Sequence, residues 1–336
     1  MPSLTLLRPT VLNGVIAEIE PPQELVGLSL METESHPFPT VLYDVTRGSR
    51  TVAKPNVPNS EAHIVPKLKT DQLAAGYSYV REKKVFEPTT MYWLRREGTL
   101  ATKKGEEAVM RELQDLDRRL RFYQEWTIWR GLFTGRLQIN EPDVKVNVDY
   151  GMADSHRPVL AGNQAWDYTD GDGKYVAPIR QHVNAWKKLV SRDGAATITD
   201  AYMNSDTRDI FMRNVLFEGG ANSILSDRQK ESLYSEGFVD GLLGLKWNVY
   251  DLAFDDGTGT HVPYIPDGYV ALLAKTNRPW VMLEGPAADF AAPADHTGKF
   301  SKTWQEQDPS ARQALLECNF FPALYRPDQV VYAKVY

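Results

Sequence analysis

Residue types that often carry catalysis or hold metals are scattered along this chain of 336 residues. Its six histidines form neither an HExxH nor an HxH pattern, so we expect no histidine metal centre. They are His36, His63, His156, His182, His261 and His296. The single cysteine, Cys318, cannot form an internal disulfide or a zinc site alone, and we expect a small buried residue there.

One acidic cluster is spaced as if it could hold a cation. Asp167, Asp170 and Asp172 precede Gly173, and carboxylate oxygens are the ligands that calcium prefers. An EF-hand loop also needs a glutamate at its twelfth position, and no register of this segment supplies one. The spacing therefore predicts a turn, with a weak cation site as the alternative.

Motifs for phosphate binding and nucleophilic catalysis are incomplete. The run Gly171-Asp172-Gly173-Lys174 is followed by Tyr175, where a Walker A loop requires serine or threonine. Residues 76–80 lack the second glycine of a nucleophile elbow, and residues 257–259 lack the third glycine of a dinucleotide fingerprint. We therefore predict no catalytic residue, no cofactor and no metal ligand. A soluble α/β enzyme stays open as an alternative, because many active sites have no local motif.

Positive charge gathers in one segment of an otherwise acidic chain. The formal net charge is −6. Residues 47–84 hold eight cations against three carboxylates, a net +5. Two extended stretches, residues 41–45 and 63–72, flank a Pro/Asn turn there, which predicts a long hairpin. Such a hairpin is marginally stable alone and needs a partner surface, here an acidic one; the alternative is a solvated basic edge. The eight predicted contact residues are Arg47, Arg50, Lys54, Lys67, Lys69, Arg81, Lys83 and Lys84.

The elements that position this hairpin include one unusually long helix, over about residues 105–133. Its apolar face recurs at steps of three and four residues, the period of a helix, and it would be about 40 Å long. This face comprises Val109, Leu113, Leu116, Leu120 and Tyr123, and Trp126, Trp129 and Leu132 continue it. Gly135 is expected to end the helix. On the other face we predict the pairs Glu107–Arg111, Asp115–Arg119 and Asp117–Arg121.

Shorter elements follow, and together they predict an α+β fold. We expect helices over residues 175–190, 207–217 and 226–236, and strands over 247–252, 269–274, 280–283, 313–320 and 330–335. A hairpin turn is expected at residues 255–259. Residues 1–40 are rich in proline and predict an extended arm. The N-terminus does not resemble a signal peptide, and no stretch is long and apolar enough for a membrane span.

A series of short sequence motifs, in the same order along the chain as in the family, resembles the lambda major head protein family of tailed bacteriophages. They begin with Tyr43-Asp44-Val45 and end at Pro327-Asp328, so only the N-terminal arm is uncovered. The family's usual Ala-Pro pair after the first loop strand is interrupted here by Lys54. The intervening motifs lie at residues 47–53, 83–88, 118–119, 125–126, 132–135, 147–151, 165–166, 179–190, 263–268, 304–312 and 321–324.

The resemblance implies the Hong Kong 97-type capsid fold. It implies an N-terminal arm at residues 1–40, an extended loop at 41–92 and a peripheral domain with the spine helix at 93–195. An axial domain would occupy residues 196–300, and residues 301–336 would return as strands of the peripheral domain. The basic hairpin would be the extended loop, lying across a neighbouring subunit.

The resemblance also implies a function and partners. The chain would be a major capsid protein that forms hexamers and pentamers of an icosahedral shell around double-stranded DNA, without sequence-specific DNA binding. A decoration protein at the three-fold positions and, during assembly, a scaffolding protein, portal and protease would be partners. The expected location is the virion, with assembly in the host bacterial cytoplasm and no membrane. An encapsulin-like compartment is the alternative with the same fold.

Some relatives join a loop lysine to an asparagine of a neighbouring subunit, with a glutamate as catalyst. Loop lysines are present here, and Asn319 lies two residues from Glu317. Such common residue types are uninformative, because the reaction needs a desolvated lysine placed against the amide. The branch that this sequence resembles does without the crosslink, so the resemblance implies a non-covalent shell.

Overall fold

The computed structural model describes residues 24–46, 52–53, 55–56, 58, 70–87, 98–140, 145–214, 226–255, 259–276, 278–293, 295–308 and 310–336, with backbone alone for 98–110, 140 and 145. The chain divides into two compact units. Unit 1 combines residues 1–41, 74–125 and 281–323, and unit 2 combines residues 42–73, 126–280 and 324–336. Each unit is therefore assembled from three separate segments of the chain.

Unit 1 is built on a five-stranded sheet with the long strand β15 (Ser310–Leu324) at its centre. β4 (Ser78–Phe86) and β14 (Lys299–Gln307) both pair antiparallel with β15, over overlapping residues and so from opposite sides. β13 (Trp280–Glu284) follows in the order, and β1 (Thr33–Ser35) pairs with it in parallel. The predicted strand at residues 313–320 is thus the inner part of a longer central strand.

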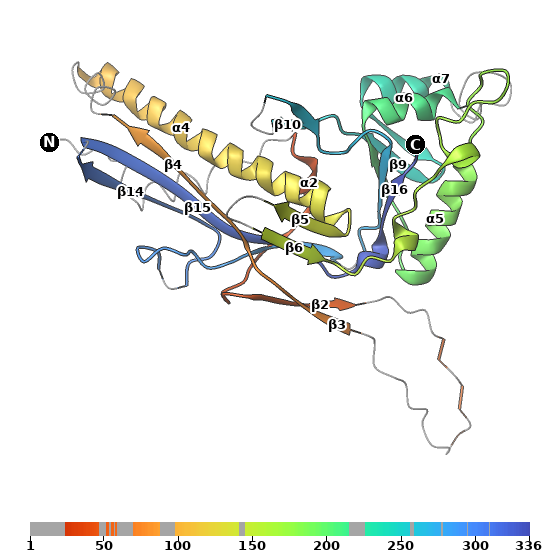
Figure 1. The fold of residues 1–336 in the computed structure, drawn as a ribbon, viewed down its shortest axis with the longest axis horizontal. Helices are drawn as coiled ribbons and strands as arrows, with labels where there is room; N and C mark the ends of the chain where they lie inside the picture. The colour runs from red at the N-terminus through yellow and green to blue at the C-terminus, as the bar shows by residue number, and fades with distance from the viewer. Residues whose placement is uncertain are drawn as a thin grey trace. The chain divides into compact units, whose positions relative to one another are not determined.

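The long helix α4 (Gly98–Thr127) lies along this sheet, as Figure 1 shows. Leu113, Leu116 and Leu120 are buried, and Tyr123 meets Phe320 of β15 edge-on with ring centroids 5.8 Å apart. The predicted helix is confirmed, and so is its apolar face from Leu113 onwards, although the helix begins earlier than expected. The side chains of Val109 and of Glu107, in the predicted pair Glu107–Arg111, lie outside the described residues. Helical periodicity was visible because these leucines recur at the spacing of one buried face.

Two predicted features of the other helix face need correction or refinement. Arg119 does not pair with Asp115; its guanidinium donates to Glu82 of β4, with the shorter distance 2.7 Å. Asp117 does pair with Arg121, at 2.5 Å, but its side chain is only 1% exposed and also pairs with Lys299 of β14. Both differences arise because the sheet covers part of this face and offers charged partners from β4 and β14.

In unit 2, the chain after α4 widens into the π-helical turn η2 (Ile128–Leu132). The predicted stop at Gly135 is confirmed: its backbone has φ +75°, a conformation that glycine adopts without a steric penalty. A Cβ at this position would lie 2.7 Å from the Cβ of Met152. Glycine is therefore required at residue 135 by both the backbone conformation and the neighbouring side chain.

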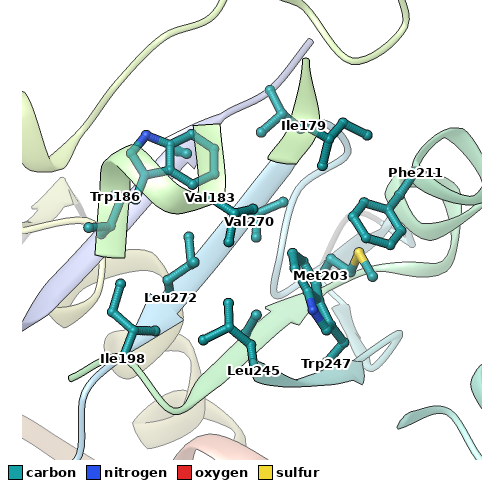
Figure 2. Close-up of a cluster of buried hydrophobic side chains, with 14 of the residues drawn as sticks. Ile179, Val183, Trp186, Ile198, Met203, Phe211, Leu245, Trp247, Val270 and Leu272 are labelled. Atoms are coloured by element: carbon teal, nitrogen blue, oxygen red, sulfur yellow. The ribbon is translucent and has the colours of Figure 1, made fainter. Parts of the chain in front are cut away.

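The sheet of unit 2 has the order β16 (Val330–Lys334), β12 (Tyr269–Leu273), β7 (Asp200–Met203), β9 (Leu245–Val249) and β8 (Phe238–Leu242). Three helices contribute to the apolar core on one side of it: α5 (Ile179–Asp193), α6 (Ser205–Arg213) and α7 (Asp227–Ser235). Figure 2 shows side chains of α5 and α6 meeting those of β7, β9 and β12.

Aromatic side chains from the π-helical turn cover the opposite face of this sheet. Trp129 lies 5.4 Å from the ring centroids of both Tyr202 and Tyr250. Phe133, just after this turn, meets Trp280, the first residue of β13, edge-on at 5.2 Å. The sheet of unit 2 is therefore buried on both faces, which explains the nearly continuous apolar character of β12 and β16.

The remaining elements are short. The hairpin expected around residues 255–259 is confirmed by the antiparallel pairing of β10 (Ala253–Asp255) with β11 (His261–Pro263). β5 (Arg136–Asn140) and β6 (Lys145–Asp149) form a second hairpin, and β2 (Val41–Thr46) pairs with β3 (Thr70–Ala75). The helix α2 (Val26–Leu30) and three 3₁₀ turns, Asp154–His156, Gly162–Gln164 and Pro327–Gln329, complete the described elements.

Some boundaries differ from those predicted. Helix α5 begins at Ile179 rather than at residue 175, and Val176, expected on its buried face, is exposed. The strands of residues 301–336 pair in both sheets, β15 with β4 and β14, and β16 with β12. The predicted division into arm, extended loop, peripheral domain and axial domain, with its bounds, remains a prediction.

Candidate functional site

The candidate contact surface predicted from sequence consists of the eight cations between residues 47 and 84. Five of them, Arg47, Arg50, Lys54, Lys67 and Lys69, lie outside the described residues. The other three, Arg81, Lys83 and Lys84, lie on β4 at one side of the central strand of unit 1. They are therefore part of a sheet, and alternation along the strand separates them onto two faces.

One face of β4 is turned towards helix α4. Lys84 Nζ lies 2.9 Å from a carboxylate oxygen of Glu112 and 3.0 Å from one of Asp115. The hydrogen bond to Glu112 is the main reason why the pKa of Lys84 is raised, and the bond from Lys84 lowers the pKa of Asp115. With the Glu82–Arg119 pair, these contacts tie β4 to α4 within one chain.

The other face of β4 carries a buried carboxylate cluster. Tyr79 donates to Glu317 Oε2 at 3.0 Å, and Arg81 Nε lies 3.6 Å from the same oxygen. Arg81 also contacts Asp289 at 3.3 Å, and Lys302 pairs with Asp289 as well. Lys302 is the largest cause of the lowered pKa of Asp289. Arg81 is therefore held largely by its own chain.

Lys83 is the described cation best placed for a contact outside the chain. It is exposed and has no ion pair with any described residue. Tyr79 and Val85 lie on the same face of β4 as Lys83, and their side chains are exposed by 43% and 52%. This combination of an unpaired cation and partly exposed apolar groups suits a protein contact, and the predicted neighbour contact stays a prediction.

The other candidate residues from sequence have structural roles. Asp170 Oδ1 accepts hydrogen bonds from the backbone N–H groups of Asp172, at 3.0 Å, and Lys174, at 2.9 Å, so the predicted turn is confirmed. Cys318 is buried in β15, and burial raises the pKa of its thiol. Asn319 Nδ2 donates to the carbonyl of Pro286 at 2.5 Å.

Neither a metal site nor a membrane-spanning helix is found among the described residues. No group of three or more His, Cys, Asp or Glu side chains there is arranged to hold a metal ion. Among the described helices, none is both long and apolar enough to span a bilayer.

Comparison with known protein families identifies the family of this chain. Residues 9–335 match the sequence profile of the family described as phage major capsid protein E. The chain belongs to this family. The predicted membership in a tailed-phage major capsid protein family is thereby confirmed, and the search of curated proteins found no match.

Solved structures of other phage proteins have folds similar to that of this capsid protein. A putative capsid protein of a prophage in E. coli CFT073 matches with a TM-score of 0.70 at 13% identity, covering 98% of this chain and 99% of that one. A phage-related protein from Bordetella bronchiseptica RB50 matches with a TM-score of 0.52 at 8% identity, covering 98% and 97%. The capsid protein of cyanophage P-SCSP1u matches at 0.50 and 8% identity, covering 91% and 86%. The Hong Kong 97-type fold expected for this capsid protein is confirmed.

Sequence reasoning missed the charged partners that fix β4 in this capsid protein. Glu112 and Asp115 stand three residues apart on α4, so they share one helix face. That spacing was a readable sign of an acidic stripe beside a basic strand. The sequence does not show which strand lies beside this acidic helix face, because β4 and α4 come together only when the sheet of unit 1 forms.

Proposed function

We propose that this major capsid protein assembles with copies of itself into hexamers and pentamers of an icosahedral head enclosing double-stranded DNA. The observation that carries the proposal is the family match over residues 9–335, nearly the full sequence. A formal charge of −6 also suits a wall that should not adhere to packed DNA, since strong DNA affinity comes from clustered Lys and Arg.

The proposed role is structural rather than catalytic. The buried titratable groups of unit 1 support this, because Glu317 and Asp117 are used in contacts within the chain. We further propose a decoration protein at the three-fold positions, and a scaffolding protein, portal and protease during assembly. The mature location would be the virion, after assembly in the host cytoplasm.

Microscopy of purified protein tests the proposal. Closed symmetric assembly predicts shells with diameters on the order of tens of nanometres in negative stain. A protein that stays monomeric at every concentration and salt condition tried, including in the presence of its own phage's scaffolding protein, contradicts the proposal. An encapsulin-like compartment predicts shells that enclose protein cargo, whereas a phage head predicts particles from infected cells that hold nuclease-protected DNA.

A further inference from the structure

A basic and aromatic groove of about 620 Å³ lies in unit 2. Its lining comes from Trp126 near the end of α4, from η2, the β5–β6 and β10–β11 hairpins, the loop after residue 156, and strands β12 and β16. All of the lining residues belong to unit 2. The groove is therefore a property of one compact unit.

Strand register explains the aromatic side of this groove. In the β12–β16 pair, Tyr269 lies opposite Lys334 and Ala271 lies opposite Tyr332, so Tyr269, Tyr332 and Lys334 share one face of the sheet. The two tyrosine rings stack with centroids 5.1 Å apart and an interplanar angle of 26°. Lys334 thus shares this face, and the lining of the groove, with a stacked aromatic pair.

Arg130 adds a cation from the π-helical turn. Its Nη2 donates to the carbonyl of Pro263 at 2.7 Å, a neutral partner, and it forms no ion pair with a described residue. Arg130 is half-buried, and burial lowers the pKa of its guanidinium. A half-buried guanidinium without a carboxylate favours binding of an anion.

The charged residues that line the groove are all basic. Arg136 and Arg157 line it together with Arg130 and Lys334, and no described lining residue is acidic. Arg136 and Arg157 have carboxylate partners outside the lining, Asp149 at 3.3 Å and Asp154 at 2.7 Å. Arg130 and Lys334 therefore leave the groove positive, while Val159, 70% exposed, offers it an apolar edge.

We propose that this groove binds residues 15–24 of the N-terminal arm of a neighbouring copy of the chain. The segment reads Val-Ile-Ala-Glu-Ile-Glu-Pro-Pro-Gln-Glu, with three carboxylates, no cation and two adjacent prolines. Its carboxylates complement Arg130 and Lys334. Its prolines favour an extended chain of the kind that docks on aromatic side chains. The basic loop of residues 47–69 is excluded as an occupant, because it carries the same charge as the groove.

The proposal rests on the proposed function, since a neighbouring copy is supplied by the shell. Shells of the double variant Ile19→Cys/Val159→Cys, oxidised with glutathione disulfide, test it on a non-reducing denaturing gel. We expect disulfide-linked multimers that reducing agent returns to single chains. Each cysteine variant alone, and the pair Ile19→Cys/Phe290→Cys, should give none; Phe290 is fully exposed in unit 1.

Exchanging the charges of the groove and the arm tests whether crosslinking depends on their attraction. In the double-cysteine background, Arg130→Glu/Lys334→Glu should lower crosslinking at least tenfold, and adding Glu18→Lys/Glu20→Lys should restore it. Shells that form without crosslinking, or crosslinks formed only within one chain, overturn this inference and leave the proposed function standing. Loss of short-DNA binding in the Arg130/Lys334 variant without any crosslink also overturns it, in favour of nucleic acid. If the wild type forms no shell, both proposals fall.

Discussion

Glu125 of α4 accepts hydrogen bonds from the backbone N–H groups of Gly27 and Leu28, at 2.7 Å and 2.8 Å, although about a hundred residues separate them. These N–H groups belong to the first turn of α2, where a helix leaves its donors unsatisfied and favours a negative charge. A fully buried carboxylate of the spine helix thus fixes α2, a segment within the predicted N-terminal arm. Glu125, the first residue of the Glu-Trp motif at residues 125–126, therefore has a structural role as the acceptor for α2.

Removing this carboxylate should destabilise the subunit. Glu125→Ala leaves two donors of α2 without their acceptor and should cost about 2–4 kcal/mol of unfolding free energy. Urea denaturation of unassembled subunits measures the loss. Glu125→Gln keeps one acceptor and should lose less, and Glu112→Ala, on an exposed side chain, should change the free energy by under about 1 kcal/mol. Equal midpoints for Glu125→Ala and the wild type would show that the cap contributes nothing.

The apolar face of α4 should behave as core. Leu116→Ala or Leu120→Ala should each lower the unfolding free energy by about 2–5 kcal/mol, because each leaves a cavity against the sheet. Arg118→Ala, at a side chain 59% exposed, is the matched control with little expected effect. If both leucine variants unfold at the wild-type urea concentration, their side chains do not fill the interface described here.

Reversal of loop charge should block assembly and leave the subunit folded. The variant Lys67→Glu/Lys69→Glu/Lys83→Glu avoids Arg81 and Lys84, which are paired within the chain. Surface charges contribute little to folding, so its urea midpoint should stay close to that of the wild type. Light scattering measures assembly.

A control variant separates a specific contact from a general effect of charge. Lys174→Glu/Arg180→Glu/Lys188→Glu makes the same change at exposed cations of unit 2 and should still assemble. Equal loss of assembly in both variants would reject a specific hairpin contact, as would normal assembly of the loop variant with unchanged salt dependence.

Acid should weaken unit 1 through Asp289. Lys302, and then the N–H of Ala291, lower the pKa of this carboxyl in the folded state below its usual value of about 3.9. Its contribution is therefore complete above about pH 4 and is lost as the pH falls through the folded pKa. Asp289→Asn should lose less stability than the wild type when urea unfolding is compared at pH 7 and pH 3.

Glu284 provides a control of opposite sign. Burial raises its pKa, so its protonation favours the folded state as the pH falls. Glu284→Gln removes that gain and should lose more stability than the wild type over the same pH interval. The same pH response in all three proteins would contradict both assignments.

The mature shell should be held by non-covalent contacts. Asn319, the candidate amide for a crosslink, is buried and donates to the Pro286 carbonyl of its own chain. Many weak contacts multiplied by closed symmetry can hold a shell without covalent links. Boiling mature heads in detergent should give a single band near 38.0 kDa on a denaturing gel. A ladder from dimers to hexamers that survives reducing agent would contradict this.

Local spacing in the sequence determined the elements of this protein. The recurrence of Leu113, Leu116 and Leu120 predicted the spine helix and its buried face, because a helix brings such positions onto one side. Glycine at residue 135 predicted its end, and the order of short motifs along the chain predicted the family. Each of these signals is read within a few residues or from motif order, so no tertiary contact was needed.

Only the tertiary structure decided which charges meet. Asp117 pairs with Lys299 across 182 residues, and Lys84 meets Glu112 because β4 and α4 belong to the same unit. The π-helical turn that places Arg130 on the groove is likewise set by packing of Trp129 on the sheet of unit 2 and of Phe133 against Trp280 of β13. A charged residue shows no period that identifies its partner. The pairing follows from which distant strands come to lie beside the helix when apolar surfaces are buried.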